Sequence, residues 1–390
     1  MKHLLFSGSS LCCHLLTSGK LMQKQFIFWK NPPSKSDRRL WVSMDNPQCP
    51  LANFIGNEKA VERLCRAAFV AMGNHNHSAA GVNYAVLGPA STGKTTLCKL
   101  FAKTLKIPFV ELDPLSLDSV EDVFKEIRNT LEENNLDLFD FGNKFQLPPC
   151  IVFVDEVHNL KKRVVQGLLK ATEPNDSQMS TESGLAIDTK AVCWMIATTD
   201  RGDLFDAFDT RFSKINLRLY SKDEVARMIK LVQKDWSIEV CRLAAKFGGI
   251  VPREALAFAV DMKMEQDMYP DDWENVSLKV AESHGIDEFG MTNQRLAILK
   301  ALGRQPISAS QLPHIVGVKI DELKKFIIPP LQAITPDQTV PLVAICSRGY
   351  TITPAGIQEL DKRNIPHNGV DAMPESILVR FGSDFDTLSN

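Results

Sequence analysis

The eight residues 88–95 constrain the fold of this chain more than any other segment. They read Gly-Pro-Ala-Ser-Thr-Gly-Lys-Thr and stand between an apolar run at 84–87 and a helical pattern at 95–104. A strand, a glycine-bordered loop and a helix in this order direct backbone N–H groups and a helix N-terminus at phosphate oxygens. The lysine would neutralise the β- and γ-phosphates of ATP and the threonine would hold Mg²⁺. The predicted nucleotide contacts are Gly88, Pro89, Ala90, Ser91, Thr92, Gly93, Lys94, Thr95 and Thr96.

Two carboxylates follow a second apolar run, about 60 residues after the loop. Residues 151–154 are Ile-Val-Phe-Val, and Asp155 and Glu156 come next. Parallel sheets bind ligands at the carboxyl ends of their strands. Asp155 would therefore join Thr95 around Mg²⁺, and Glu156 would polarise the attacking water. The pair predicts a hydrolase.

Three further positions are weaker signals. Residues 195–199 read as a core strand ending in hydroxyls, one of which would hold the water beside Glu156. Arg211 is either a surface charge or an arginine finger that reaches the ATP of a neighbouring subunit. Arg253 follows Pro252, which suits the first turn of a helix, and it either belongs to a capped helix or contacts phosphate.

Strands alternate with helices from about residue 51 to 219, which predicts an α/β fold with a parallel sheet and right-handed crossovers. Four helical patterns follow, and then helices with two β-rich pieces at 340–346 and 350–353, the order of a winged helix. The predicted domains are a basic extension at 1–47, an ATP-binding domain at 48–220, a helical lid at 221–286, a winged-helix DNA-binding domain at 287–360 and a loose polar tail at 361–390.

The composition is that of an ordinary soluble protein. Lys and Arg number 45 against 47 Asp and Glu, a net charge of −2, which excludes a histone-like chain but allows a local DNA-binding patch. Nine scattered cysteines without a C-x-x-C pair predict neither a zinc site nor a disulfide framework, and indicate a reducing compartment. No apolar run predicts a membrane span. The first 43 residues carry seven basic side chains and one acid, as in a floppy extension, a targeting segment or a start mis-assigned ahead of Met44.

These motifs together resemble the AAA+ ATPases. The ordered set is the phosphate loop, Asp-Glu-Val-His at 155–158, Ala-Thr-Thr at 197–199, Asp-Thr-Arg-Phe at 209–212 and Gly-Ile-Val-Pro-Arg at 249–253, followed by the predicted winged helix. Within that family the set is similar to the RuvB-type motors, which drive Holliday-junction branch migration in recombination and repair. The likeness covers roughly residues 48–360.

The resemblance implies roles for single residues at the nucleotide. Thr199 would be the first sensor, Arg253 the second sensor, and Arg211 the finger that acts on a neighbour's ATP. Phe54 and Ile55 would pack by the adenine, as part of the opening segment Phe-Ile-Gly-Asn-Glu. The tyrosine that lies at the nucleotide in the family corresponds to Tyr220.

The resemblance also implies partners. Arg348 in the wing would contact DNA, with Lys324 and Lys325 as further candidates. The implied assembly is a homo-hexamer on double-stranded or four-way junction DNA, in the cytoplasm of a bacterial or phage-infected cell. A RuvA-like junction-binding protein would dock on the segment 173–190.

Several residues depart from the family pattern. The loop has Pro-Ala-Ser-Thr where Pro-Pro-Gly-Leu is usual, Asp200 stands where an arginine is usual, and Asp209-Thr210 removes one of two arginines. The segment 173–190 is polar and lacks an obvious apolar anchor. These departures predict a divergent relative, for which a phage origin is one explanation, and they leave the RuvA-like partner open.

Two other functions remain open. One is a clamp loader or helicase loader, although clamp loaders usually carry a Ser-Arg-Cys finger and a helical collar. The other is an ATP-dependent regulator whose winged helix binds DNA or protein without translocation.

Overall fold

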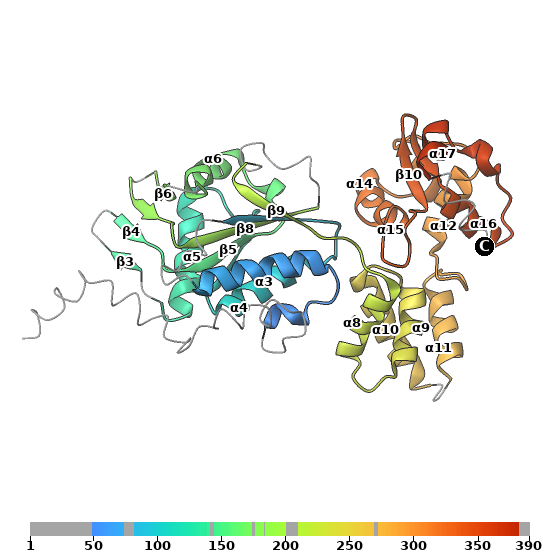
Figure 1. Cartoon of the computed structure of the whole chain (residues 1–390), viewed down its shortest axis with the longest axis horizontal. Helices are drawn as coiled ribbons and strands as arrows, with labels where there is room; N and C mark the ends of the chain where they lie inside the picture. Colours follow the sequence, from blue (N-terminus) through green and yellow to red (C-terminus); the bar gives the residue numbers. More distant parts are fainter. Residues whose placement is uncertain are drawn as a thin grey trace, which may run out of the picture.

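A five-stranded parallel sheet lies at the centre of the N-terminal region (Figure 1). In the computed structural model the strand order is β2-β5-β8-β1-β9, and each neighbouring pair is parallel. The fold class predicted from the sequence is therefore confirmed. The strands are β1 Asn83–Leu87, β2 Phe109–Leu112, β5 Cys150–Val154, β8 Val192–Thr198 and β9 Phe212–Asn216.

The structure describes residues 49–73, 82–136, 138–140, 144–173, 176–182, 184–199, 210–268 and 272–381. The basic extension predicted at 1–47 lies outside these ranges. Asp200 and Asp209, two of the departures from the family pattern, lie outside them as well.

Helices cover both faces of the sheet, which explains why its strands are apolar without alternation. Along β5, Val152 and Val154 face a core shared with α5 and α6, whereas Ile151 and Phe153 face a core shared with α3 and α4. All five residues of β5 are buried. The short and long helices of this region are η1 Pro50–Asn53, α3 Glu58–Gly73, α4 Lys94–Leu105, α5 Val120–Glu133, η2 Val157–Asn159 and α6 Lys162–Ala171.

A second, small sheet contains part of the segment 173–190. Met179 and Ile187 are fully buried in the core that α5 and α6 share, so they pack within this chain. Met179 stands between Gln178 and Ser180, and the sequence pattern did not indicate its burial. The sheet order is β3-β4-β7-β6, with β3 Phe139–Asp140, β4 Lys144–Gln146, β6 Gln178–Ser180 and β7 Ala186–Asp188.

Four helices follow the sheet region and pack around a core of their own. Ser221 caps the first of them and forms a reciprocal pair of hydrogen bonds with Glu224, so the helix begins where the sheet region ends. The four helices occur at the predicted places. They are α8 Lys222–Val232, α9 Ile238–Gly248, α10 Pro252–Gln266 and α11 Trp273–Ser283.

The C-terminal region combines short helices with one antiparallel hairpin, β10 to β11, around a further core (Figure 1). The order of its elements follows the prediction, while its assignment as a winged helix stays a prediction. The elements are α12 Asn293–Leu302, α13 Leu312–Val316, α14 Ile320–Glu322, the π-helical turn η3 Leu323–Ile327, α15 Ile328–Leu331, β10 Val343–Cys346, β11 Gly349–Ile352 and α16 Pro354–Asp361.

The predicted loose tail at 361–390 is wrong for its described part. The chain continues through η4 Gly369–Ala372 into α17 Glu375–Phe381. Met373 and Ile377 are buried in the same core as the hairpin. Ala372, Leu378 and Phe381 belong to or pack on that core as well, and burial of this apolar surface stabilises the segment.

Within the described residues, no helix combines the length and the apolar character needed to cross a bilayer.

Candidate nucleotide site

The loop between β1 and α4 depends on glycine at both ends, for different reasons. Gly93 has φ +80°, a left-handed conformation, and a Cβ there would meet the Phe54 ring at 3.1 Å. Gly88 needs space instead, because a Cβ would lie 2.7 Å from the backbone oxygen of Leu217. Between them, Ser91 adopts φ 62° without being glycine. The loop is therefore tightly curled against both the segment before α3 and the strand β9.

Lys94 is folded back into this loop. Its Nζ donates hydrogen bonds to the backbone oxygens of Gly88 and Pro89, at 3.1 and 3.2 Å. Burial lowers the pKa of Lys94, while the carboxylates of Glu156 and Asp155 oppose that shift. The ammonium group thus lies where phosphate oxygens would replace the two carbonyls.

The sheet brings the two halves of the predicted Mg²⁺ site together. Thr95 Oγ1 donates to Asp155 Oδ2 at 2.8 Å, from the start of α4 to the end of β5. A hydroxyl and a carboxylate are the oxygen ligands that Mg²⁺ takes alongside substrate phosphates and waters. Among the described residues no three His, Cys, Asp or Glu side chains form a metal cluster.

Glu156 occupies a strained position beside this pair. Its φ of 47° is left-handed, which is uncommon for a glutamate and recurs at functional sites. Its Oε2 accepts hydrogen bonds from the backbone N and the Oγ1 of Thr199, at 3.2 and 3.1 Å. His158 Nδ1 lies 3.4 Å from the same oxygen and 3.2 Å from Thr198 Oγ1. The predicted water-activating acid and the predicted sensor therefore contact each other.

A cleft of about 780 Å³ collects most of the predicted residues between the sheet region and the helical region. Gly88 and Pro89 form the base of the loop and do not line this cleft, although Pro89 lines a smaller cavity beside it. The predicted residues that line the cleft are Phe54, Ile55, Ala90, Ser91, Thr92, Gly93, Lys94, Thr95, Thr96, Asp155, Glu156, Thr199, Tyr220, Arg253 and Lys325.

Sequence reasoning missed the apolar wall that the lid contributes. Met228, Leu231 and Leu256 line the cleft. Leu231 is 60% exposed although it lies in an amphipathic helix. An exposed leucine on the first helix of the predicted lid was the available signal. Phe326 also lines the cleft, from the C-terminal region, and no local pattern pointed to it.

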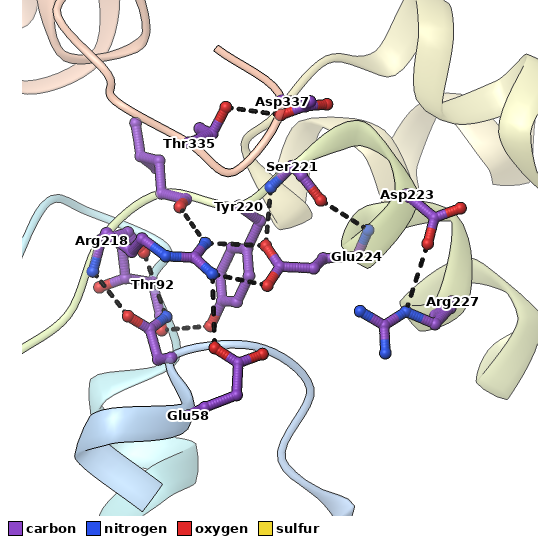
Figure 2. A network of polar contacts seen from close by, with 12 residues as sticks. Glu58, Thr92, Arg218, Tyr220, Ser221, Asp223, Glu224, Arg227, Thr335 and Asp337 are labelled. Carbon is purple, nitrogen blue, oxygen red and sulfur yellow. Dashed lines mark hydrogen bonds and ion pairs between the residues drawn. The ribbon is translucent and has the colours of Figure 1, made fainter. Parts of the chain in front are cut away.

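A polar network fixes the junction between the sheet region and the lid (Figure 2). Arg218 donates to both carboxylate oxygens of Glu224, at 2.7 and 2.8 Å, and its guanidinium lies 3.6 Å from Glu58. Asn57 pairs with the backbone of Arg218 in both directions, through Nδ2 to O and from N to Oδ1. The segment that carries Phe54 and Ile55 is thereby tied to the chain that enters α8.

Tyr220 connects this junction to the phosphate loop. Its hydroxyl donates to the backbone oxygen of Thr92 at 2.7 Å, and the side chain is fully buried (Figure 2). Burial raises the pKa of Tyr220, which keeps the hydroxyl protonated as a donor. Gly56, with φ +70°, leaves room for this packing, because a Cβ there would lie 2.7 Å from Glu224 and 3.0 Å from the Tyr220 ring.

Arg211 lies outside the cleft of its own chain. It stands just before β9, and its guanidinium pairs with Glu173 at 3.0 Å. Its side chain is 26% exposed. The structure thus separates Arg211 from the phosphate loop of the same chain.

The three residues predicted to contact DNA fall into two settings. Arg348 is exposed in the turn between β10 and β11, and Lys324 is exposed on the π-helical turn η3. Lys325 is also exposed on η3, but it lines the nucleotide cleft together with Phe326. Its location next to the phosphate loop was not anticipated.

Comparisons with known proteins agree with this geometry. Residues 84–221 match the model of the ATPase family associated with various cellular activities (AAA). Over 162 residues the chain is 28% identical to ClpX, the ATP-binding subunit of the ATP-dependent Clp protease, from two strains of Porphyromonas gingivalis. That match covers 36% of this chain and 37% of ClpX, so it spans little more than a third of either protein.

Solved structures extend the likeness to most of the chain. The RuvB Holliday junction branch migration motor of Thermotoga maritima superposes with a TM-score of 0.61 at 22% identity, over 82% of this chain and 99% of that one. A structure of an amino-acid variant of the same protein gives 0.62 at 22% identity, over 80% and 97%. The chain therefore carries an AAA ATPase domain, whose ligand is ATP with Mg²⁺, within a RuvB-like AAA+ fold.

Proposed function

We propose that this protein is an ATP-driven motor that moves double-stranded DNA, with branch migration of four-way junctions as its reaction. The cleft carries the proposal. It surrounds one space with Lys94, the Thr95–Asp155 pair and the Glu156–Thr199 pair, in a chain of RuvB-like fold.

Each cleft residue has a chemical task in this proposal. Lys94 leaves its two carbonyl partners for the β- and γ-phosphates, which carry full negative charge. Thr95 and Asp155 hold Mg²⁺, which neutralises charge on the phosphate oxygens. Glu156 turns from Thr199 to orient the attacking water, and the Thr199 hydroxyl is then free to hydrogen-bond that water or the γ-phosphate.

We propose that a second subunit completes the site. Arg211 is held by Glu173 outside its own cleft, at the edge strand β9, where a neighbouring copy would meet it. Its charge would stabilise the transition state on the neighbour's ATP, while Arg253 contacts phosphate from the lid of the same chain. Sites shared in this head-to-tail manner close into a ring, for which we propose a homo-hexamer.

Contacts to DNA are proposed for Arg348 and Lys324. Both are exposed, on the hairpin turn and on η3. A motor that translocates must bind the phosphate backbone and ignore base sequence. Binding through these residues should weaken steeply with salt, because each contact releases condensed counterions. We also propose that the functional units are residues 48–220, 221–286 and 287–381.

A RuvA-like partner is not assigned to the small sheet. Met179 and Ile187, the buried apolar residues of its hairpin, face the core of this chain. The exposed part of the hairpin, which includes Ser180 and Glu182, is polar. Any junction-binding partner would need to recognise polar groups there.

The test measures ATPase rates with and without four-way junction DNA. DNA should stimulate the wild-type rate, and Arg211→Ala should abolish turnover while nucleotide binding is retained. Arg163→Ala, an exposed arginine on α6, is the matched control and should leave the rate unchanged. An Arg211→Ala protein that turns over ATP normally would exclude the shared site.

Mixing two inactive variants provides a sharper test. Lys94→Ala removes the loop cation but keeps Arg211, whereas Arg211→Ala keeps the loop. In a ring that contains both, some interfaces join an intact loop to an intact finger, so mixing should restore part of the activity. Activity that stays absent on mixing, in rings shown to contain both variants, would argue against catalysis in trans.

A loader is the alternative function. Its ATPase would respond to a sliding clamp or a replicative helicase, and ATP-dependent movement of junction strands would be absent. A strand-exchange assay on a labelled four-way junction therefore separates the two functions.

A further inference from the structure

The C-terminal region reaches back to the phosphate loop. A cavity of about 90 Å³ beside the main cleft is lined by Ala90 and Ser91 on one side and by Lys325 and Phe326 on the other. Arg253 lines it as well. Five residues line both this cavity and the large cleft, and so stand where the two spaces meet: Ala90, Ser91, Arg253, Lys325 and Phe326.

The π-helical turn η3 presents Lys325 at this place. Leu323 and Ile327 anchor the turn in the C-terminal core, while Lys324, Lys325 and Phe326 between them are exposed. Two prolines follow the turn, and proline has no N–H to continue a helical ladder. Pi-helical turns recur at functional sites.

Arg295, on α12 of the C-terminal region, joins this turn to the lid. Pro330 cannot donate to the backbone oxygen of Phe326, and Arg295 Nη2 approaches that oxygen at 3.4 Å. The same nitrogen lies 2.9 Å from Glu254, next to Arg253 on α10 of the lid. Arg295 itself is 13% exposed, whereas Glu254 is 40% exposed. The turn and the second-sensor helix are therefore linked to each other.

The two cations that line both spaces, Arg253 and Lys325, lack protein partners among the described residues. Among the residues that the structure describes, neither Arg253 nor Lys325 has a hydrogen bond or an ion pair. Cations that face a cleft without a partner favour an anion there. The adjacent loop residues Ala90 and Ser91 indicate the phosphate end of the nucleotide as that anion.

We propose that Lys325 contacts the terminal phosphate of ATP bound in the same chain, beside Arg253. The inference rests on the proposed ATPase function and adds a contact to it. Through this contact, the C-terminal region that is proposed to bind DNA responds directly to the presence of the γ-phosphate. Loss of that phosphate releases Lys325, and η3 moves with it.

The experiment titrates the full chain with a fluorescent non-hydrolysable ATP analogue and with fluorescent ADP. Lys325→Ala should weaken binding of the triphosphate about tenfold, as expected for one charge-assisted hydrogen bond, and change ADP binding by less than about threefold. Lys325→Arg keeps the charge and should retain most of the affinity. Lys319→Ala is the matched control, because this exposed lysine just before α14 lies outside both the cleft and the small cavity, and it should stay within about twofold of wild type.

A second measurement follows the lysines themselves. The triphosphate analogue should protect Lys325, and not Lys324, from an amine-reactive reagent detected by mass spectrometry. Lys325→Ala and Lys319→Ala proteins with equal affinities, or equal labelling of Lys325 and Lys324, would overturn the inference. If Lys94→Ala abolishes binding but Lys325→Ala has no effect, only this inference fails. If the wild-type protein binds no nucleotide, the proposed function fails with it.

Discussion

Two arginines each form ion pairs at a junction between regions of this protein, and we call each arginine with its carboxylates a clamp. The two clamps differ in their burial and in their distance from the nucleotide cleft. Arg218 holds Glu224 where the sheet region enters the lid. Arg363 holds Asp287 at 2.6 Å and Glu359 at 2.7 Å where the lid enters the C-terminal region. Arg218 is 31% exposed and Arg363 only 5%. The second clamp is therefore the more deeply buried of the two.

Both clamps are arginine–carboxylate pairs, but only the first lies next to the nucleotide cleft. Two residues after Arg218, Tyr220 bonds to the phosphate loop, and both its ring and the Phe54 ring border the nucleotide cleft. The partners of Arg363 are absent from the lining of that cleft, and its guanidinium packs on Phe289 instead. The first junction therefore borders the nucleotide cleft, whereas the described partners of the second do not line it.

Arg363→Ala should give the largest loss of stability. The substitution leaves Asp287 and Glu359 without their cation and removes the contact with Phe289. Breaking a largely buried pair in this way costs about 3–5 kcal/mol in free energy of unfolding. Chemical denaturation followed by a probe in the C-terminal region measures it, and nucleotide affinity should be unchanged.

Lys362→Ala is the control for that variant, because its ion pair with Glu359 is exposed. It should cost less than about 1 kcal/mol. A fall in nucleotide affinity in the Arg363→Ala protein would show that the second junction is coupled to the cleft after all.

Arg218→Ala should cost less stability but affect function. Glu224, 4% exposed, loses both hydrogen bonds from the guanidinium, a loss of about 2 kcal/mol. Without the guanidinium, the chain that leads to Tyr220 is held less firmly to α8, which should loosen the contact between Tyr220 and the phosphate loop and lower ATP affinity about fivefold. Arg227→Ala, which breaks an exposed pair on the same helix, should change neither quantity measurably. Unchanged ATP affinity in Arg218→Ala would remove the distinction between the junctions.

Acid should weaken both clamps. Burial alone would raise the pKa of Glu224, but the hydrogen bonds from Arg218 and the Ser221 amide outweigh it and hold the pKa below the ordinary 4.5. Burial of Glu359 is likewise outweighed, by hydrogen bonds from Lys362 and Arg363, so its pKa also lies below 4.5. Depressed pKa values give stability that is fully present above about pH 4.5 and is lost as pH falls through the folded-state values.

Unfolding measured between pH 7 and pH 3 tests this dependence. Glu224→Gln and Glu359→Gln should each be less stable at pH 7 and should lose less stability on acidification than the wild type. Variants with the wild-type slope would show that other carboxylates govern the acid response.

Relief of backbone strain should give the smallest difference in stability between the phosphate-loop side and the Arg363 side of the molecule. Ser91 at the phosphate loop and Asn364 next to Arg363 both have left-handed backbone, with φ 62° and 52°. Asparagine tolerates this conformation better than serine. Ser91→Gly should therefore stabilise by about 0.5 kcal/mol, and Asn364→Gly should be nearly neutral or slightly destabilising. Equal effects in thermal unfolding would mean that the loop stores no extra strain.

The parts of the fold that the sequence predicted are those set by local patterns. The run 150–154 predicts a buried strand because all its residues are apolar. The glycine-bordered loop at 88–95 predicts the strand before it and the helix after it. Once both are placed in a parallel sheet, the contact between Thr95 and Asp155 follows from the strand ends alone.

The features that were missed depend on contacts between distant segments. Met179 stands between two polar residues, so its burial is decided by the core that receives it. In the sequence, Lys325 is one of two adjacent lysines. Only the spaces that it lines beside the phosphate loop distinguish it from Lys324.

The grip of Thr199 on Glu156 has a consequence for a solitary copy of this protein. Two donors occupy the carboxylate, and the backbone that carries it is strained, so Glu156 is not free to orient a water in this conformation. Under the proposed function, a lone subunit would bind ATP but hydrolyse it slowly until assembly and DNA displace the acid from Thr199. Such a resting state would limit the consumption of ATP by unassembled subunits.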